Sequence, residues 1–162
     1  YDNKNAVQTQ SYGPESRGGT SYADVHIAES EVLSPSSASP HILIAFNAPS
    51  LNKFAPHVRP GGVIIYDRSV IPAVPNLNHG VTMIGVPMTQ IATDLGKVMV
   101  KNIVALGALQ AATNLFPKDS FINAIRLSLK DKCAMIPLNE EAFRWGVKAV
   151  EDKLEYPEES VL

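Results

Sequence analysis

Short apolar runs recur through the middle of this chain, and segments with helical character follow the first and the third of them. The runs are HILIAF at 41–46, VIIY at 63–66 and VTMIGVP at 81–87. Continuous apolar runs of this length are typical of parallel strands, because both faces of such strands are buried. Strands that alternate with helices indicate the α/β class. The predicted fold is a three-layer, mainly parallel sheet with flanking helices.

Helix signals follow the first and third runs, whereas 67–80 after the second run has the composition of a loop. Pro49 suits the first turn of one helix, and Gly96 can end another short helix in the left-handed conformation. Helical spacing then continues over 98–113 and 117–129, and Asn139 is the predicted N-cap of a last helix. We therefore expect a helical C-terminal part after the sheet.

Two segments near the start of the chain also have strand character. They are NAVQTQS at 5–11 and TSYADVHI at 20–27. The second alternates strictly between two faces, with Ala23, Val25 and Ile27 on one and Tyr22, Asp24 and His26 on the other. This period of two predicts a half-buried strand, with the apolar face as the buried one.

The segment between these strands, SYGPESRGG at 11–19, combines turn signals with a cation. Its glycines leave backbone N–H groups accessible, and Arg17 adds a planar fork suited to phosphate or carboxylate. Such a loop can form an anion cradle, and in open α/β sheets ligands lie beyond the carboxyl ends of strands. An equally good interpretation is that Arg17 pairs with Glu15 or with a neighbouring subunit and only shapes the loop.

Composition sets limits on the function. The 162 residues suit one domain, and 14 Lys and Arg against 16 Asp and Glu leave no basic excess for nucleic acid. No apolar run reaches the roughly 18 residues of a membrane span. The single cysteine, Cys133, excludes an internal disulfide; we expect it to be buried, in a cytoplasmic protein. The chain starts without Met, which we interpret as a start partway through a longer protein.

Other polar residues give weaker indications. The four histidines lack metal-ligand spacing, so we assign neither a metal site nor a catalytic residue. Asp67 and Arg68 end a predicted strand, where ligand contacts and a turn-side ion pair fit equally well. Asn102 is expected to pack within its helix. Candidate apolar subunit contacts are the loop 70–75 and the helix around Phe143 and Trp145.

Five blocks in order carry a resemblance to a known family. They are TQSYGPESRGG, RPGGVIIYD, IGVPMTQIATDLG, KNIVALGAL and LNEEAFRWG. Together the blocks resemble the gamma subunit of the 2-oxoacid:ferredoxin oxidoreductases, and TQSYGPE favours the 2-oxoglutarate branch over the pyruvate branch. The Gly-rich strand–turn–helix unit with which that family's gamma chains open is absent from this sequence. The five blocks otherwise extend over nearly the whole chain, 1–162, which we take as a single gamma-type domain.

The resemblance implies a subunit that is inactive alone, within an enzyme that oxidatively decarboxylates a 2-oxoacid to an acyl-CoA and reduces ferredoxin. It implies thiamine diphosphate, Mg²⁺, [4Fe–4S] clusters and coenzyme A in the whole complex, none of them held by this chain alone. The implied partners are alpha and beta subunits, with a delta subunit as a further candidate, and ferredoxin through the complex. The implied coenzyme A path or subunit contact is formed by Ser11, Tyr12, Gly13, Glu15, Arg17, Gly18 and Gly19. The alternative is a stand-alone α/β module that binds a nucleotide or coenzyme-A-like anion without catalysis.

Overall fold

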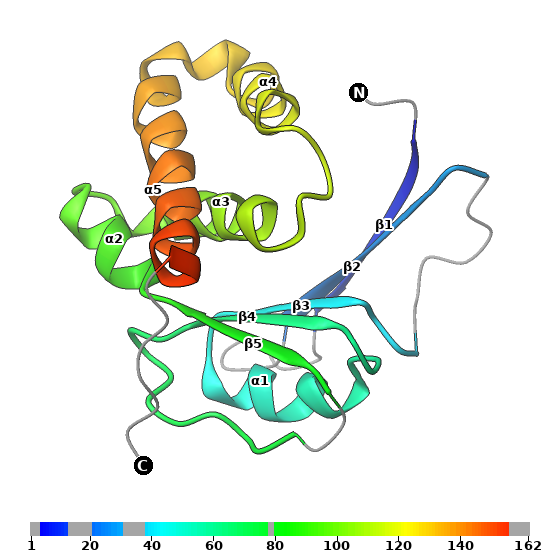
Figure 1. The fold of residues 1–162 in the computed structure, drawn as a ribbon. Coiled ribbons are helices and arrows are strands. Elements are labelled where there is room, and N and C mark those ends of the chain that lie inside the picture. The colour runs from blue at the N-terminus through cyan, green and yellow to red at the C-terminus, as the bar shows by residue number, and fades with distance from the viewer. Residues whose placement is uncertain (1–3, 13–20, 31–37, 78–79, 156–162) are drawn as a thin grey trace.

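The computed structural model describes residues 4–12, 21–30, 38–77 and 80–155, which form two sheets and a set of helices (Figure 1). Strands β1 (Asn5–Tyr12) and β2 (Ser21–Ala28) pair antiparallel. Strands β3 (Ile42–Ala45), β4 (Val63–Asp67) and β5 (Thr82–Val86) form a parallel sheet in that order. The helices are α1 (Ala48–Phe54), α2 (Met88–Asp94), α3 (Lys101–Thr113), α4 (Lys118–Ser128) and α5 (Ile136–Glu155).

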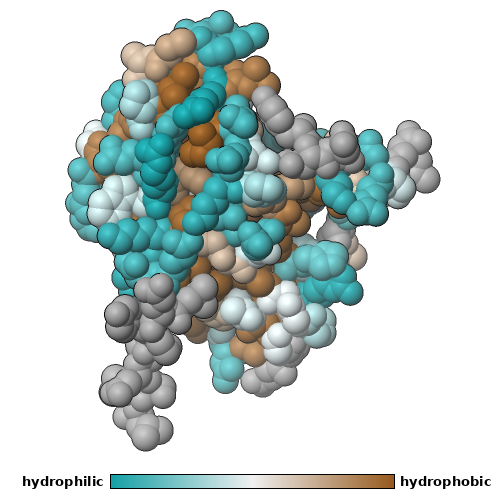
Figure 2. Space-filling view, turned by 45° about the horizontal axis from the view of Figure 1, so that its top comes forward, coloured by the Kyte–Doolittle hydropathy of each residue, from teal (hydrophilic) through white to brown (hydrophobic). Residues whose placement is uncertain are grey.

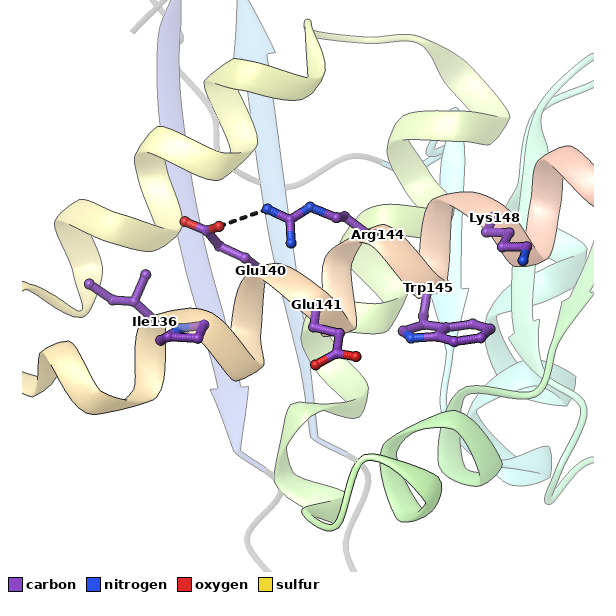
Figure 3. Close-up of a pocket in the computed structure, with 7 residues that line it drawn as sticks. Ile136, Glu140, Glu141, Arg144, Trp145 and Lys148 are labelled. Atoms are coloured by element: carbon purple, nitrogen blue, oxygen red, sulfur yellow. Dashed lines mark hydrogen bonds and ion pairs between the residues drawn. The ribbon is translucent and has the colours of Figure 1, made fainter.

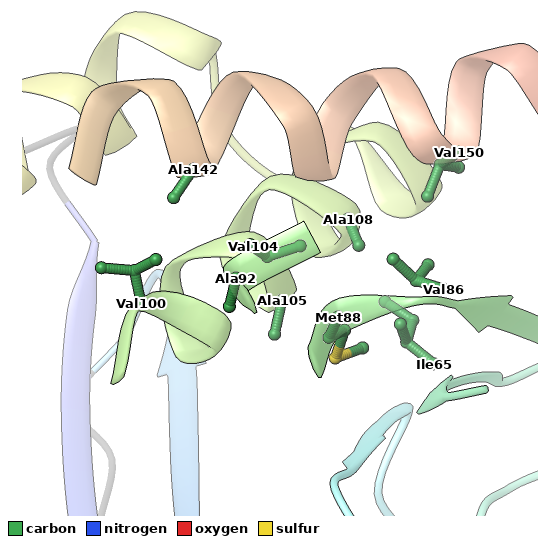
Figure 4. Close-up of a cluster of buried hydrophobic side chains, with 10 residues drawn as sticks. All are labelled: Ile65, Val86, Met88, Ala92, Val100, Val104, Ala105, Ala108, Ala142 and Val150. Carbon is green, nitrogen blue, oxygen red and sulfur yellow. The ribbon is translucent and has the colours of Figure 1, made fainter. Parts of the chain in front are cut away.

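The parallel sheet is the middle of three layers, as predicted. In Figure 1, α1 lies on one side of it and α3 and α5 on the other. Neighbouring residues of β4 show why this strand is apolar throughout. Ile65 packs with Val104 and Val150 of the helical layer (Figure 4), whereas Ile64 packs with Leu51 of α1. Both faces of the strand are therefore buried, and the α/β prediction with a helical C-terminal part is confirmed.

Helices α3 and α5 approach each other at backbone distance. A Cβ atom added to Gly107 of α3 would lie 2.1 Å from the Phe143 carbonyl oxygen. A Cβ atom added to Gly146 of α5 would lie 2.0 Å from the Val104 carbonyl oxygen. Each glycine thus leaves the space that the other helix occupies, and the two helices pack closely where they cross.

Two of the three predicted helix boundaries are correct. Pro49 lies in the first turn of α1, and Gly96 follows α2 with a φ of 82°. Asn139 is not an N-cap, because α5 begins earlier, at Ile136. Asn139 is instead buried in the helix, and its Nδ2 donates a hydrogen bond of 2.7 Å to the Met135 carbonyl oxygen. Pro137, a residue suited to a first helical turn, is the signal for this earlier start.

Strands β1 and β2 form a separate two-stranded ribbon, with Asn5 opposite Ala28 and Tyr12 opposite Ser21. At its Asn5–Ala28 end the ribbon extends away from the rest of the molecule (Figure 1). The period of two is confirmed, but the prediction of which face is buried was wrong. Val25 and Ile27 are 60% and 37% exposed, whereas Asp24 and His26 on the opposite face are half-buried.

None of the described helices combines the length and the apolarity that a membrane span requires.

Candidate functional site

The predicted glycine loop lies between the two strands of the ribbon. Ser11 and Tyr12 end β1 and pair with Tyr22 and Ser21 of β2. The remaining predicted site residues lie outside the described residues, namely Gly13, Glu15, Arg17, Gly18 and Gly19. The loop does follow a strand, but this strand belongs to the ribbon and not to the parallel sheet. The expectation of a ligand at the carboxyl edge of an open α/β sheet therefore does not apply to it.

An aromatic pair with a cation lies where the chain returns from this loop. The rings of Tyr22 and Phe54 have centroids 5.1 Å apart, at 57° to each other. The Lys53 ammonium lies 5.2 Å from the centroid of the Phe54 ring. The ring contact joins β2 to α1, and Tyr22 is 41% exposed there. The sequence did not reveal it, because Tyr22 and Phe54 belong to separate elements.

The carboxyl edge of the parallel sheet is held together by a buried carboxylate. Asp67, at the end of β4, accepts hydrogen bonds from the Ser69 N–H at 3.1 Å and from the Thr89 N–H at 3.2 Å. The Thr89 hydroxyl also donates to Asp67, at 2.5 Å. Because these donors engage both carboxylate oxygens, Asp67 has a structural role in joining β4 to the start of α2. The sequence interpretations were a ligand contact and a turn-side ion pair; the structure instead shows Asp67 accepting hydrogen bonds from uncharged donors in the turn and at the start of α2.

A cluster of opposite charges connects α4 to α5. The Glu140 carboxylate accepts a hydrogen bond of 2.6 Å from the Arg126 Nε and one of 2.8 Å from the Arg144 Nη2. We call these three residues the arginine cluster. The spacing of Glu140 and Arg144 on one helix is the sequence signal that would have identified half of it. The hydrogen bond from Arg126, which is the main cause, and that from Arg144 hold the pKa of Glu140 below its ordinary value of 4.5, against the opposing effect of burial.

This lowered pKa predicts how acid affects the fold. A carboxylate whose pKa is depressed by folding stabilises the folded state fully above its unfolded pKa, and this stability is lost as the pH falls through the folded pKa. We therefore expect wild-type stability to fall below about pH 4.5 in part through Glu140. Glu140→Gln should be less stable at pH 7 and should lose that part of the acid dependence, as measured by urea unfolding at a series of pH values. An unchanged acid limb in Glu140→Gln would contradict the assignment.

Beside the arginine cluster, α5 presents an exposed hollow with a mixed lining (Figure 3). Trp145 is 44% exposed there, and the Lys148 ammonium lies 5.3 Å from the centroid of its ring. In Figure 2 apolar side chains are visible between hydrophilic ones on the helical part of the molecule. Phe143, the other predicted contact on this helix, is buried, and in the loop 70–75 Val70 and Val74 are exposed.

The remaining polar residues differ from expectation in two places. Cys133 is exposed, so its predicted burial was wrong. It lies in the short 3₁₀ helix Lys130–Met135 before α5, where its Sγ donates to the Lys130 carbonyl oxygen. Asn102 is exposed at the start of α3, and its Oδ1 accepts from the Ile103 N–H. Within the described parts of the chain, no three His, Cys, Asp or Glu side chains are grouped so that they could hold a metal ion.

Comparisons with known proteins place this geometry in context. Residues 1–149 match the family model described as pyruvate ferredoxin/flavodoxin oxidoreductase. The chain is 40% identical over 126 residues to the 2-oxoglutarate synthase subunit KorC of Methanocaldococcus jannaschii. This match covers 77% of this chain and 67% of the relative. It is 38% identical over 146 residues to the ketoisovalerate oxidoreductase subunit VorA of Methanothermobacter marburgensis, covering 89% of this chain and 30% of the relative.

One solved structure supports the same relationship. The gamma subunit of a keto/oxoacid ferredoxin oxidoreductase from Geobacter sulfurreducens superposes with a TM-score of 0.76 at 31% identity, over 94% of this chain and 83% of that one. The chain thus spans about two thirds of the KorC relative and less than a third of the VorA relative.

Proposed function

The chain belongs to the pyruvate ferredoxin/flavodoxin oxidoreductase family, and from this premise we propose that it acts as the gamma subunit of a 2-oxoacid:ferredoxin oxidoreductase. The observation that carries the proposal is the 40% identity to a 2-oxoglutarate synthase subunit, together with the superposition on a gamma subunit. Nothing in the fold or the comparisons favours a stand-alone binding module.

We assign this chain a role in assembly and in access of coenzyme A, with the electron transfer carried by partner chains. A [4Fe–4S] cluster requires about four thiolates, and the chain has one cysteine, so the cluster does not fit this chain alone. The chain's own contribution is the glycine loop with Arg17, whose base carries Tyr22, Phe54 and Lys53. These groups suit the adenine and phosphates of coenzyme A, by stacking and by charge.

We further propose 2-oxoglutarate as the substrate of the complex. The TQSYGPE block and the similarity to KorC support this choice, whereas the similarity to VorA makes 2-oxoisovalerate the competing substrate. The subunits proposed as partners are alpha and beta chains, with ferredoxin as the electron acceptor.

Co-purification tests the proposal directly. An affinity-tagged chain, expressed in its native host, should bring down alpha and beta chains in a fixed ratio. The purified complex should reduce ferredoxin with 2-oxoglutarate only when coenzyme A is present, and more slowly with 2-oxoisovalerate or pyruvate. Recovery of the chain alone would reject the subunit assignment, and preference for another 2-oxoacid would reject only the substrate.

The role of the glycine loop can be measured in that complex. We expect Arg17→Ala to raise the apparent KM for coenzyme A by about 10-fold or more, because a direct charge-assisted contact to a phosphate is lost. Decarboxylation of the 2-oxoacid should change little, since that step is assigned to partner chains. Steady-state kinetics with varied coenzyme A, alongside single-turnover decarboxylation, separates the two effects.

Arg17→Lys is the matched control, because it keeps the charge and loses the planar fork. It should recover part of the coenzyme A affinity. If both variants assemble poorly, Arg17 contacts Glu15 or a neighbouring subunit, and the ligand role is wrong. Unchanged coenzyme A dependence in a fully assembled Arg17→Ala complex would also remove the loop from the ligand path.

A further inference from the structure

We draw no further inference here: the strongest candidate, the groove between α4 and α5, is rimmed by Arg126 and Arg144, whose charge Glu140 already engages, and nothing in the structure shows what covers it.

Discussion

We expect Gly107→Ala to lower the free energy of unfolding by about 3 kcal/mol, although alanine is the better helix former. The new methyl group would lie 2.1 Å from the Phe143 carbonyl oxygen, which is part of the α5 backbone and not a side chain that can rotate away. Helices α3 and α5 would have to move apart at this crossing, which weakens the apolar contacts around it. Thermal unfolding should show a decrease in Tm of about 10 °C for a domain of this size.

Gly146→Ala should have a similar effect, because its methyl group would lie 2.0 Å from the Val104 carbonyl oxygen. The double variant should cost less than the sum of the two, since the helices have already separated at the same crossing. The control is Ala124→Gly on the exposed side of α4, which should cost about 1 kcal/mol through helix propensity alone. A Gly107→Ala variant as stable as the wild type would show that the helices do not cross at backbone distance.

The sequence predicted the parallel sheet well because its signal is local. A run such as VIIY at 63–66 is apolar on both sides, and the only common environment for it is a strand covered on both faces. The ends of α1 and α2 were predicted for the same reason, since proline and glycine act on the backbone where they stand. The resemblance to gamma subunits, carried by five separate blocks, is confirmed.

The errors concern choices that no local pattern decides. The alternation along β2 showed that the strand has two different faces. Which face is covered depends on what lies beside the ribbon, and in the structure Val25 is exposed whereas His26 is half-buried. Burial of Cys133 was inferred from its apolar neighbours, yet Cys133 is exposed in the 3₁₀ helix before α5. Tyr22 and Phe54 are brought together by tertiary structure alone, so spacing in the sequence could not pair them. The role of the glycine loop as a coenzyme A path or subunit contact stays a prediction, because its candidate residues after Tyr12 lie outside the described residues.

The buried carboxylate at the carboxyl edge of the sheet gives the second large effect. Helix α2 has no side-chain N-cap of its own, because Pro87 precedes it. The residues after β4 replace that cap: Asp67 accepts from the Thr89 N–H, and the Ser69 hydroxyl oxygen accepts from the Gln90 N–H at 3.1 Å. Donors at a helix start are costly to bury without an acceptor, so this pair of residues determines where α2 begins.

We therefore expect Asp67→Ala to destabilise the domain by about 3 kcal/mol, since it leaves the Ser69 N–H and both Thr89 donors without their acceptor in a partly buried site. Thr89→Val removes one of these donors together with its bond, and should cost only about 1 kcal/mol. Urea unfolding of both variants, with m-values close to wild type, measures the two costs. The ordering follows from which partner is removed: losing the acceptor leaves several donors unpaired, whereas losing the hydroxyl leaves Asp67 with its N–H partners. Equal costs for the two variants would mean that the Thr89 hydroxyl alone carries the connection between β4 and α2.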